Sequence, residues 1–296
     1  MFENIIGNTN IKTVLEKSIK QNKLSHSYLF VGIQGIGKKM IATEFAKMIL
    51  CLDDNKYCNH CKSCIEFDTN NNPDFVLISP DENNIKIEQI RDIQKRIQEK
   101  PIISEKKVYI IDNADLMTTE AQNCLLKTLE EPPEFAVIIL IGSNSNTFLP
   151  TIKSRCTIMN FNKISDEEMT KYLREKCDVK NIDQNMLYMY QGSIGKALEL
   201  KEKQEEYKNI ENIINNIDRY DLIDFINNAE ILYKSKEEIN DILDYINVIL
   251  FNKAKDEYLY TNCIQIVENT KKRLKQNANY DMSIDNMLFN IWEEIN

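Results

Sequence analysis

Glycine and proline are scarce in this chain, which has 7 glycines and 6 prolines among its 296 residues. The hydrophobic fraction is 43%. Few turn-forming residues and ample apolar residues indicate an ordered, mostly helical globular protein without a low-complexity tail. At this length we expect two or three domains.

Long apolar runs are missing as well. No stretch of about 18 consecutive apolar residues occurs, so we expect no membrane span. The first residues lack the basic and apolar segments of a secretory signal, so we expect a cytoplasmic protein rather than a secreted one.

Positive charge is not in excess either. The net charge of −9 argues against a surface that binds nucleic-acid phosphates throughout. A local basic patch stays open. Lys153 with Arg155 is one candidate and residues 271–275 are another, although the second is typical of a solvated helix face.

The most informative segment is residues 32–39, GIQGIGKK, which fits the phosphate-binding motif G-x-x-x-x-G-K-[ST] except at its last position. In that motif, backbone N–H groups cradle the phosphates, the lysine reaches the β and γ oxygens, and the Ser or Thr hydroxyl holds Mg²⁺. Lys39 stands where the hydroxyl belongs, and an ammonium group has no lone pair for a metal. The context is that of strand, turn and helix, because residues 27–31 are apolar and Ile41 and Phe45 fall on one helical face.

Two roles for this loop stay open. The second cation at Lys39 could attract phosphates, or it could project into the metal position and exclude Mg²⁺ and ATP together. ATP binding is therefore undecided, while we expect no ATP hydrolysis. The candidate nucleotide-binding residues of this degenerate site are Gly32, Gly35, Gly37, Lys38, Lys39 and Asp112.

Asp112 follows an apolar run, residues 108–111, that delivers it to the C-terminal end of a strand, where ligands bind in an open α/β sheet. An Asp there normally helps to hold Mg²⁺. Asn113 stands where related ATPases carry a Glu that activates water, and an amide is a poor general base. Asp115 lies further along and could be only a helix cap.

Four of the eight cysteines fall in one short stretch, with the spacing C-x₆-C-x₂-C-x₂-C. They are Cys51, Cys58, Cys61 and Cys64. Because four sulfur ligands complete a tetrahedral shell, this pattern predicts a structural Zn²⁺ site, which would also stabilise a polar insert with little core of its own. His60 could compete for one ligand position. Free thiols or disulfides are the alternative, and disulfides are disfavoured in a cytosolic chain.

Five short apolar runs predict strands, and helical patterns separate them. The strands are expected at 27–31, 75–78, 108–112, 137–141 and 157–161. Such alternation predicts a parallel, doubly wound α/β sheet. From Ser165 onward the pattern is helical only, and Ser165 opens a helix with a capping box. We therefore expect an α/β domain at 1–163 with the cysteine insert at 51–64, a small helical domain at 164–203 and a larger helical domain at 204–296.

These motifs together resemble the clamp-loader subunits of the AAA+ superfamily. The resemblance rests on the phosphate-binding loop, the four-cysteine insert after its helix, the run LLKTLEEPP at 125–133 and the run SRC at 154–156. It covers roughly the first two thirds of the chain, and the cysteine insert is typical of the bacterial members. It implies a P-loop AAA+ sheet domain, a helical lid domain and an all-α collar domain.

Departures from the ATPase subunits of that family point to one kind of member. The ATPase pattern has Ser or Thr at 39, Glu at 113 and an Arg in a Gly-Ser-x-Arg motif, whereas this chain has Lys39, Asn113 and Gly195. This chain therefore lacks three groups on separate elements of one ATP site. In that pattern it resembles the delta-prime family of non-hydrolysing subunits of the bacterial DNA polymerase III holoenzyme. This resemblance implies a catalytic role for Arg155, as a finger reaching the ATP site of a neighbouring ATPase subunit.

The resemblance also implies a role and partners. We expect a stator that helps to load the sliding clamp onto primer-template DNA in replication, beside gamma/tau ATPase subunits and the delta subunit. Lys127 and Asn144 are weaker site candidates. The alternative is a working gamma/tau-like ATPase motor in which Lys39 is tolerated. A third interpretation, a nucleic-acid-binding zinc module, is disfavoured because only Lys56 and Lys62 could reach phosphates.

Overall fold

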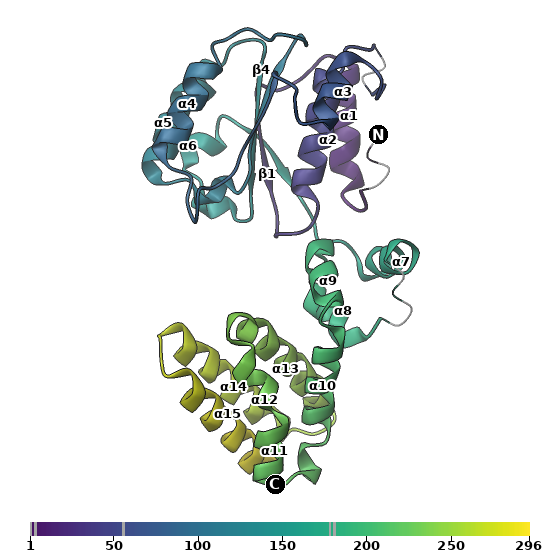
Figure 1. Cartoon of the computed structure of the whole chain (residues 1–296), viewed down its shortest axis with the longest axis vertical. Helices are drawn as coiled ribbons and strands as arrows, with labels where there is room; N and C mark the ends of the chain where they lie inside the picture. The colour runs from purple at the N-terminus through teal and green to yellow at the C-terminus, as the bar shows by residue number, and fades with distance from the viewer. Residues whose placement is uncertain (1, 3–4, 55–56, 178, 180–181) are drawn as a thin grey trace. The chain divides into compact units, whose positions relative to one another are not determined.

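The structure is a computed structural model, and it describes residues 2, 5–54, 57–177, 179 and 182–296. The chain divides into two compact units (Figure 1). Unit 1 comprises Met1–Cys177 and Gly192–Gly195, and unit 2 comprises Asp178–Gln191 and Lys196–Asn296. The division into three domains at 163 and 203 stays a prediction.

Unit 1 is built around a parallel five-stranded sheet with the strand order β2-β3-β4-β1-β5. The strands are β1 (Ser27–Val31), β2 (Phe75–Ile78), β3 (Lys107–Ile111), β4 (Ala136–Gly142) and β5 (Thr157–Asn160). Every neighbouring pair is parallel, and the register sets Ser27 opposite Ile138. The predicted doubly wound sheet is confirmed, with the ends of the last three strands displaced by one residue.

Helices cover both faces of this sheet (Figure 1). One face carries α1 (Thr9–Lys20), α2 (Lys38–Leu50) and α3 (Lys62–Asp68), and the other carries α4 (Ile87–Arg96), α5 (Thr119–Glu130) and α6 (Pro150–Lys153). The turns η1 (Ala114–Leu116) and η2 (Ser145–Thr147) follow β3 and β4, and α7 (Asp166–Lys176) follows β5. The helix cap predicted at Ser165 is confirmed, and Thr118 caps α5 in the same way, because each side chain accepts a backbone N–H three residues on.

The core of unit 1 follows from the alternation of side chains along the strands. Tyr28 and Phe30 of β1 join the apolar cluster under α1 and α2, and Leu29 and Val31 join the cluster under α4 and α5. Every residue of β1 is buried. A strand buried on both faces reads as a continuous apolar run, which is why the sequence reveals it.

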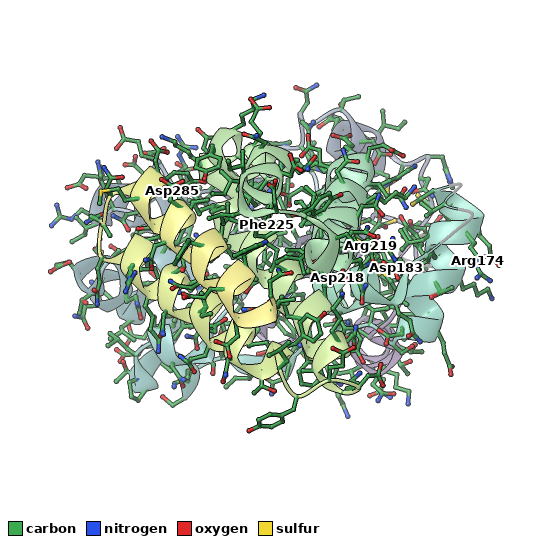
Figure 2. All side chains as sticks on the ribbon, turned by 90° about the horizontal axis from the view of Figure 1, so that it is seen from below. Arg174, Asp183, Asp218, Arg219, Phe225 and Asp285 are labelled. Atoms are coloured by element: carbon green, nitrogen blue, oxygen red, sulfur yellow. The ribbon has the colours of Figure 1, made fainter. Side chains whose placement is uncertain are left out.

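The described residues of unit 2 form helices without a strand. They are α8 (Gln184–Tyr190), α9 (Ile194–Lys201, its first two residues in unit 1), α10 (Gln204–Asn215), η3 (Ile217–Arg219), α11 (Leu222–Asn228), α12 (Glu230–Lys234), η4 (Lys236–Glu238), α13 (Ile239–Ala254), α14 (Tyr260–Lys275) and α15 (Tyr280–Ile295). Figure 2 labels Phe225 of α11 and Asp285 of α15 in this unit. Phe225 is fully buried, and Asp285 accepts a hydrogen bond from the Tyr233 hydroxyl. None of the helices in the described part of the chain is long and apolar enough to cross a bilayer.

Candidate functional site

The phosphate-binding loop joins β1 to α2 at the C-terminal edge of the sheet. Gly35 and Gly37 have φ angles of +77° and +89°, which glycine adopts without strain. Gly37 is the N-cap of α2, and Lys38 is its first residue. A turn from a buried strand into a helix N-terminus presents backbone N–H groups in the manner that phosphate binding by this motif needs.

Lys38, the lysine of the motif, is nearly buried, with 8% of its surface exposed. Its Nζ donates hydrogen bonds to the carbonyl oxygens of Gly32 (2.6 Å) and Ile33 (2.8 Å). Burial lowers the pKa of this ammonium, while the carboxylates of Asp115 and Asp112 act in the opposite direction. The lysine therefore lies in the loop, folded back on the loop's own carbonyl groups.

Asp112 directly follows β3, and its backbone N–H donates to the carbonyl of Ile78 (2.8 Å). Its side chain is 13% exposed, and its Oδ2 lies 2.8 Å from Nζ of Lys39. Lys39 itself is half exposed. The carboxylate that would help to hold Mg²⁺ in an active ATPase thus has an ammonium group as its partner here.

The residues after Asp112 shape this edge of the sheet. Asn113 adopts the left-handed region (φ +49°), and its backbone N–H donates to Oδ1 of Asp112 (3.1 Å). The interpretation of Asp115 as only a helix cap is wrong. Asn113 precedes the turn η1 as its N-cap, whereas the Asp115 carboxylate accepts hydrogen bonds from the backbone N–H and the hydroxyl of Ser143 after β4. Asp115 therefore joins the ends of β3 and β4.

The two weaker site candidates are Asn144, which directly precedes η2, and Lys127 on α5. Asn144 caps η2 through its side-chain oxygen, which accepts the N–H of Asn146 (2.9 Å). Lys127 is exposed on α5. Neither observation assigns a nucleotide contact to these side chains.

The turn Gly192–Gly195 approaches the phosphate-binding loop within unit 1. The N–H of Gly195 donates to the carbonyl of Gly35 (2.9 Å). A Cβ built on Gly195 would lie 2.8 Å from Cα of Gly35, and one built on Gly35 would lie 2.2 Å from Oγ of Ser193. Two glycine backbones thus meet at residue 195, where the expected Gly-Ser-x-Arg pattern of the ATPase subunits has an arginine.

Gly195→Ala tests whether this backbone contact contributes to stability. In the first turn of a helix, alanine ordinarily stabilises by about 1 kcal/mol relative to glycine. Here we expect a loss of about 1–3 kcal/mol, because the new methyl group meets backbone atoms that cannot rotate away. Thermal unfolding checks this, with Glu199→Ala on the exposed face of α9 as the control. A stabilised Gly195→Ala variant would show that the contact is loose.

Arg155 lies between α6 and β5, and a third of its side chain is exposed. Its Nη2 is 2.7 Å from Oε1 of Glu130, at the end of α5, and its Nη1 donates to the carbonyl of Thr151 (2.9 Å). The backbone is fixed as well, since the Ser27 hydroxyl donates to the Arg155 carbonyl (2.6 Å). The guanidinium is therefore held in one orientation by groups from two helices.

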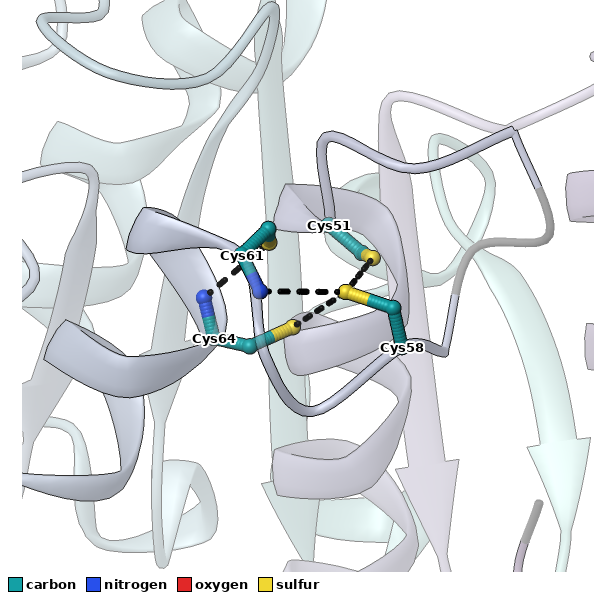
Figure 3. Close-up of side chains that lie close together, drawn as sticks. All are labelled: Cys51, Cys58, Cys61 and Cys64. Atoms are coloured by element: carbon teal, nitrogen blue, oxygen red, sulfur yellow. Dashed lines mark hydrogen bonds between the residues drawn. The ribbon is translucent and has the colours of Figure 1, made fainter.

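The sulfur atoms of the four clustered cysteines all lie within 4.8 Å of one another and could hold a metal ion (Figure 3). Cys58 Sγ is 3.6 Å from that of Cys51 and 4.0 Å from that of Cys64. With Zn–S bonds of about 2.3 Å, a regular tetrahedron places its sulfurs about 3.8 Å apart. Both separations are close to this spacing, so the four side chains are compatible with a Zn²⁺ site.

Backbone amides support thiolate charge in this cluster. Burial would raise the pKa of Cys61, but the N–H groups of Leu52 and Cys64, together with the neighbouring thiols, lower it to about 6. For Cys64, burial and the Cys61 side chain raise the pKa. The backbone amides thus favour the thiolate of Cys61, whereas burial disfavours that of Cys64, and a bound cation would offset this effect.

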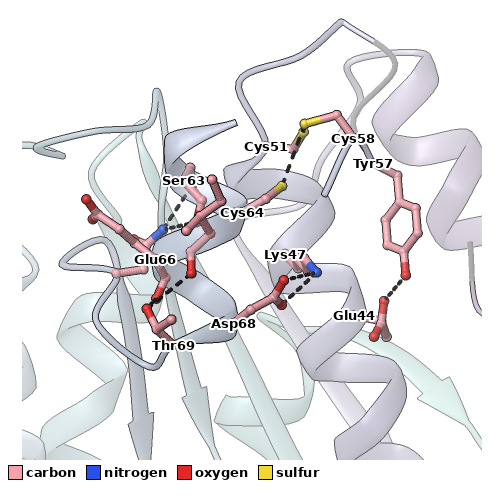
Figure 4. A network of polar contacts seen from close by, with 12 residues as sticks. Glu44, Lys47, Cys51, Tyr57, Cys58, Ser63, Cys64, Glu66, Asp68 and Thr69 are labelled. Atoms are coloured by element: carbon pink, nitrogen blue, oxygen red, sulfur yellow. Dashed lines mark hydrogen bonds and ion pairs between the residues drawn. The ribbon is translucent and has the colours of Figure 1, made fainter. Parts of the chain in front are cut away.

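The cysteine insert is anchored to α2 by polar contacts (Figure 4). The nearly buried ammonium of Lys47 lies 2.7 Å from Oδ1 of Asp68 at the end of α3. The hydroxyl of Tyr57 donates to Oε2 of Glu44 (2.7 Å). Of the two lysines considered for phosphate contacts, Lys56 lies outside the described residues, and Lys62 faces Glu66 at 3.8 Å.

Comparison with known proteins identifies the family. The sequence model described as "DNA polymerase III, delta subunit" matches residues 7–165, more than half of the chain. This chain belongs to that family of DNA polymerase III subunits.

Individual relatives show how far the similarity extends. The chain is 35% identical to the DNA polymerase III subunit delta′ of Bacillus subtilis over 196 residues, which are 66% of this chain and 59% of that one. It is 34% identical to B. subtilis subunit tau over 65% of this chain and 34% of tau. The matched stretch thus covers about three fifths of delta′ and about a third of tau. The gamma subunit-related protein of DNA polymerase III from Thermotoga maritima has a similar fold, with a TM-score of 0.51, 19% identity, and coverage of 97% of this chain and 99% of that one.

Asp74 supports the cysteine insert of this DNA polymerase III subunit. This residue was not identified from the sequence. Asp74 is fully buried before β2, and its carboxylate accepts the backbone N–H groups of residues 102–104 at 2.7–2.8 Å. Ser104 in turn donates through its hydroxyl to the carbonyl of Leu50, immediately before the first cysteine. The sequence signal that could have identified Asp74 was a carboxylate directly before an apolar strand. A carboxylate buried there needs several hydrogen-bond donors, so it marks a structural contact.

Proposed function

We propose that this chain is a non-hydrolysing, delta-prime-like stator of the bacterial sliding-clamp loader, acting in DNA replication in the cytoplasm. It would assemble with gamma/tau ATPase subunits and the delta subunit, and would meet the sliding clamp and primed DNA through that complex. It would contribute no catalysis of its own to the polymerase holoenzyme. The ion pair between Lys39 and Asp112 carries this proposal.

This ion pair supports the proposal that Lys39 blocks the Mg²⁺ position. Mg²⁺ takes oxygen ligands at about 2.0–2.1 Å in a near-octahedral shell. The ammonium of Lys39 lies 2.8 Å from the Asp112 carboxylate, so it competes for that oxygen and repels a second cation. Binding of Mg²⁺ with ATP would have to break this ion pair. The Lys39 ammonium would then lie beside a divalent cation.

Two further features support the same conclusion. Asn113 offers an amide where a carboxylate would activate water, and its backbone is turned into the left-handed region. Gly195 brings its backbone against Gly35, with no guanidinium to reach a γ-phosphate. The Mg²⁺ ligand, the group that activates water and the group that contacts the γ-phosphate are thus all missing. Restoring one of them would leave the other two absent.

We therefore expect Lys39→Thr to leave ATP turnover by the isolated chain at background. The hydroxyl would restore a Mg²⁺ ligand, but Asn113 and Gly195 would still lack the groups that act on water and on the γ-phosphate. Turnover and ATP binding should be measured with Mg²⁺ for the wild type, for Lys39→Thr and for Lys38→Ala as the loop control. A clear rise in turnover for Lys39→Thr would contradict a retired site.

The alternative is an active gamma/tau-like motor. It is favoured by the strand, turn and helix around the phosphate-binding loop, which keeps the motif lysine at Lys38, and by the 34% identity to subunit tau. The same assay separates the two functions. Wild-type turnover that Lys38→Ala abolishes would establish the motor, whereas absence of turnover supports the stator.

The arginine finger is the second part of the proposal. Arg155 is fixed at the edge of unit 1 by Glu130 and Thr151 while a third of its side chain stays exposed. A preset, partly exposed guanidinium suits a role in a neighbouring subunit's ATP site. Residues 164–203 as a lid, residues 204–296 as an assembly collar and Zn²⁺ as a structural ion in the four-cysteine insert complete the proposed organisation.

A further inference from the structure

The cysteine cluster has a second set of metal-binding groups beside it. A carboxylate oxygen of Asp53, the sulfur of Cys58 and a ring nitrogen of His60 lie within 4.8 Å of one another. Cys58 belongs to both sets, since its sulfur is also one of the four clustered cysteine sulfurs. The two sets therefore meet at one atom.

The two sets differ in how far solvent reaches them. Cys51 and Cys64 of the four-sulfur set are buried, with 2% and 1% exposed surface. Asp53 and Cys58 are half-buried, and His60 is exposed. The mixed set is thus the more exposed of the two, and the two deepest sulfurs belong to the four-sulfur set.

The ring of His60 is held by a contact with the backbone. Its Nδ1 lies 2.8 Å from the carbonyl oxygen of Cys58. A carbonyl can only accept, so Nδ1 is the donor in this contact, and Nε2 is the ring nitrogen that a neutral imidazole would offer to a metal. Metal-binding histidines commonly donate their other ring N–H to a backbone carbonyl in this way. The hydrogen bond is an observation independent of the clustering.

We propose that Asp53, Cys58 and His60 form a loading site through which Zn²⁺ enters and leaves the four-sulfur site. This inference rests on the proposed structural zinc. These side chains would hold Zn²⁺ through one oxygen, one sulfur and one nitrogen, and water could complete the shell, so the ion would stay exchangeable there. Cys58 would be a ligand in both sites. As the sulfurs of Cys51, Cys61 and Cys64 replace the outer ligands, each thiol that is still protonated releases its proton to water.

A loading site has a kinetic signature that a structural ligand lacks. A residue that stabilises only the pathway changes uptake and release by the same factor and leaves the equilibrium affinity unchanged. For the double variant Asp53→Asn with His60→Gln, we expect both rates to fall about tenfold, the lower end of the losses that follow removal of supporting polar groups at metal sites. One zinc ion per chain should still bind.

The experiment uses the full chain under reducing conditions. Uptake is followed by mixing apo-protein with ZnCl₂, and release by mixing zinc-loaded protein with a chromophoric chelator. The matched control is Asp54→Asn with His26→Gln, which removes an exposed carboxylate and the chain's other imidazole from positions outside the mixed set. The control should keep the wild-type rates.

Three results would overturn the inference. Wild-type rates in the double variant would show that the ion follows another path. Loss of equilibrium zinc binding in that variant would make Asp53 and His60 ligands or supports of the resident site. A wild-type chain that binds no zinc would refute both the structural zinc and its loading site. If only the predicted fall in the uptake and release rates is not observed, the loading site is refuted and the four-sulfur zinc site is not.

Discussion

Replacing Arg155 with alanine should slow ATP hydrolysis by the reconstituted clamp loader by about 10³-fold or more at the site that the proposed finger would serve, the scale that arginine fingers supply in trans. The isolated subunit should stay folded. The substitution removes a partly exposed ion pair with Glu130, and exposed pairs contribute about 0–1 kcal/mol to stability. The assay is steady-state ATP turnover by the complex on primed DNA with the clamp present.

Matched variants separate the finger from general effects of charge. Lys153→Ala removes a neighbouring cation from the end of α6 and should leave turnover near the wild-type value. Arg155→Lys keeps the charge but loses the planar fork, so it should recover only a small part of the rate. Glu130→Gln tests the support of the finger, and its effect should be far smaller than that of Arg155→Ala. Unchanged turnover for Arg155→Ala in a complex that still assembles would remove the finger from the proposal.

Much of unit 1 could be predicted because its signals are local. The strand β1 is buried on both faces and therefore appears as an apolar run, and Gly35 and Gly37 mark the turn that follows it. The caps at Thr118 and Ser165 depend on residues within one helical turn. Strand ends shifted by one residue because pairing with a neighbouring strand, rather than local composition, decides where a ladder stops.

Contacts between distant segments could not be predicted in this way. Lys39 and Asp112 are far apart in the sequence, and only the sheet order sets them 2.8 Å apart. The sequence therefore left two roles open for Lys39. The contact of Asp115 could not be predicted for the same reason, because its partner Ser143 comes from another strand end. The cysteine cluster is the exception, since its spacing alone specifies a common site.

Replacing Cys61 with serine should remove one of the four sulfurs from the proposed zinc site. We expect the bound zinc to fall from one ion per chain to near zero after dialysis against a chelator, since loss of a direct ligand should cost more than the 10–100-fold that follows loss of a supporting group. Zinc binding and folding of such an insert are one process, so the segment should lose order together with the ion. Elemental analysis measures the first effect, and hydrogen exchange measures the second.

The loss of order should be graded, because the anchors of the insert do not involve sulfur. Lys47 still pairs with Asp68, so α3 should keep part of its protection, whereas residues 51–61 should exchange freely and β1 should stay protected. Cys177→Ser, outside the cluster, is the control and should retain zinc. A wild-type chain without metal under reducing conditions would refute the zinc assignment. Exchange that spreads into β1 would instead show that the ion supports the whole sheet.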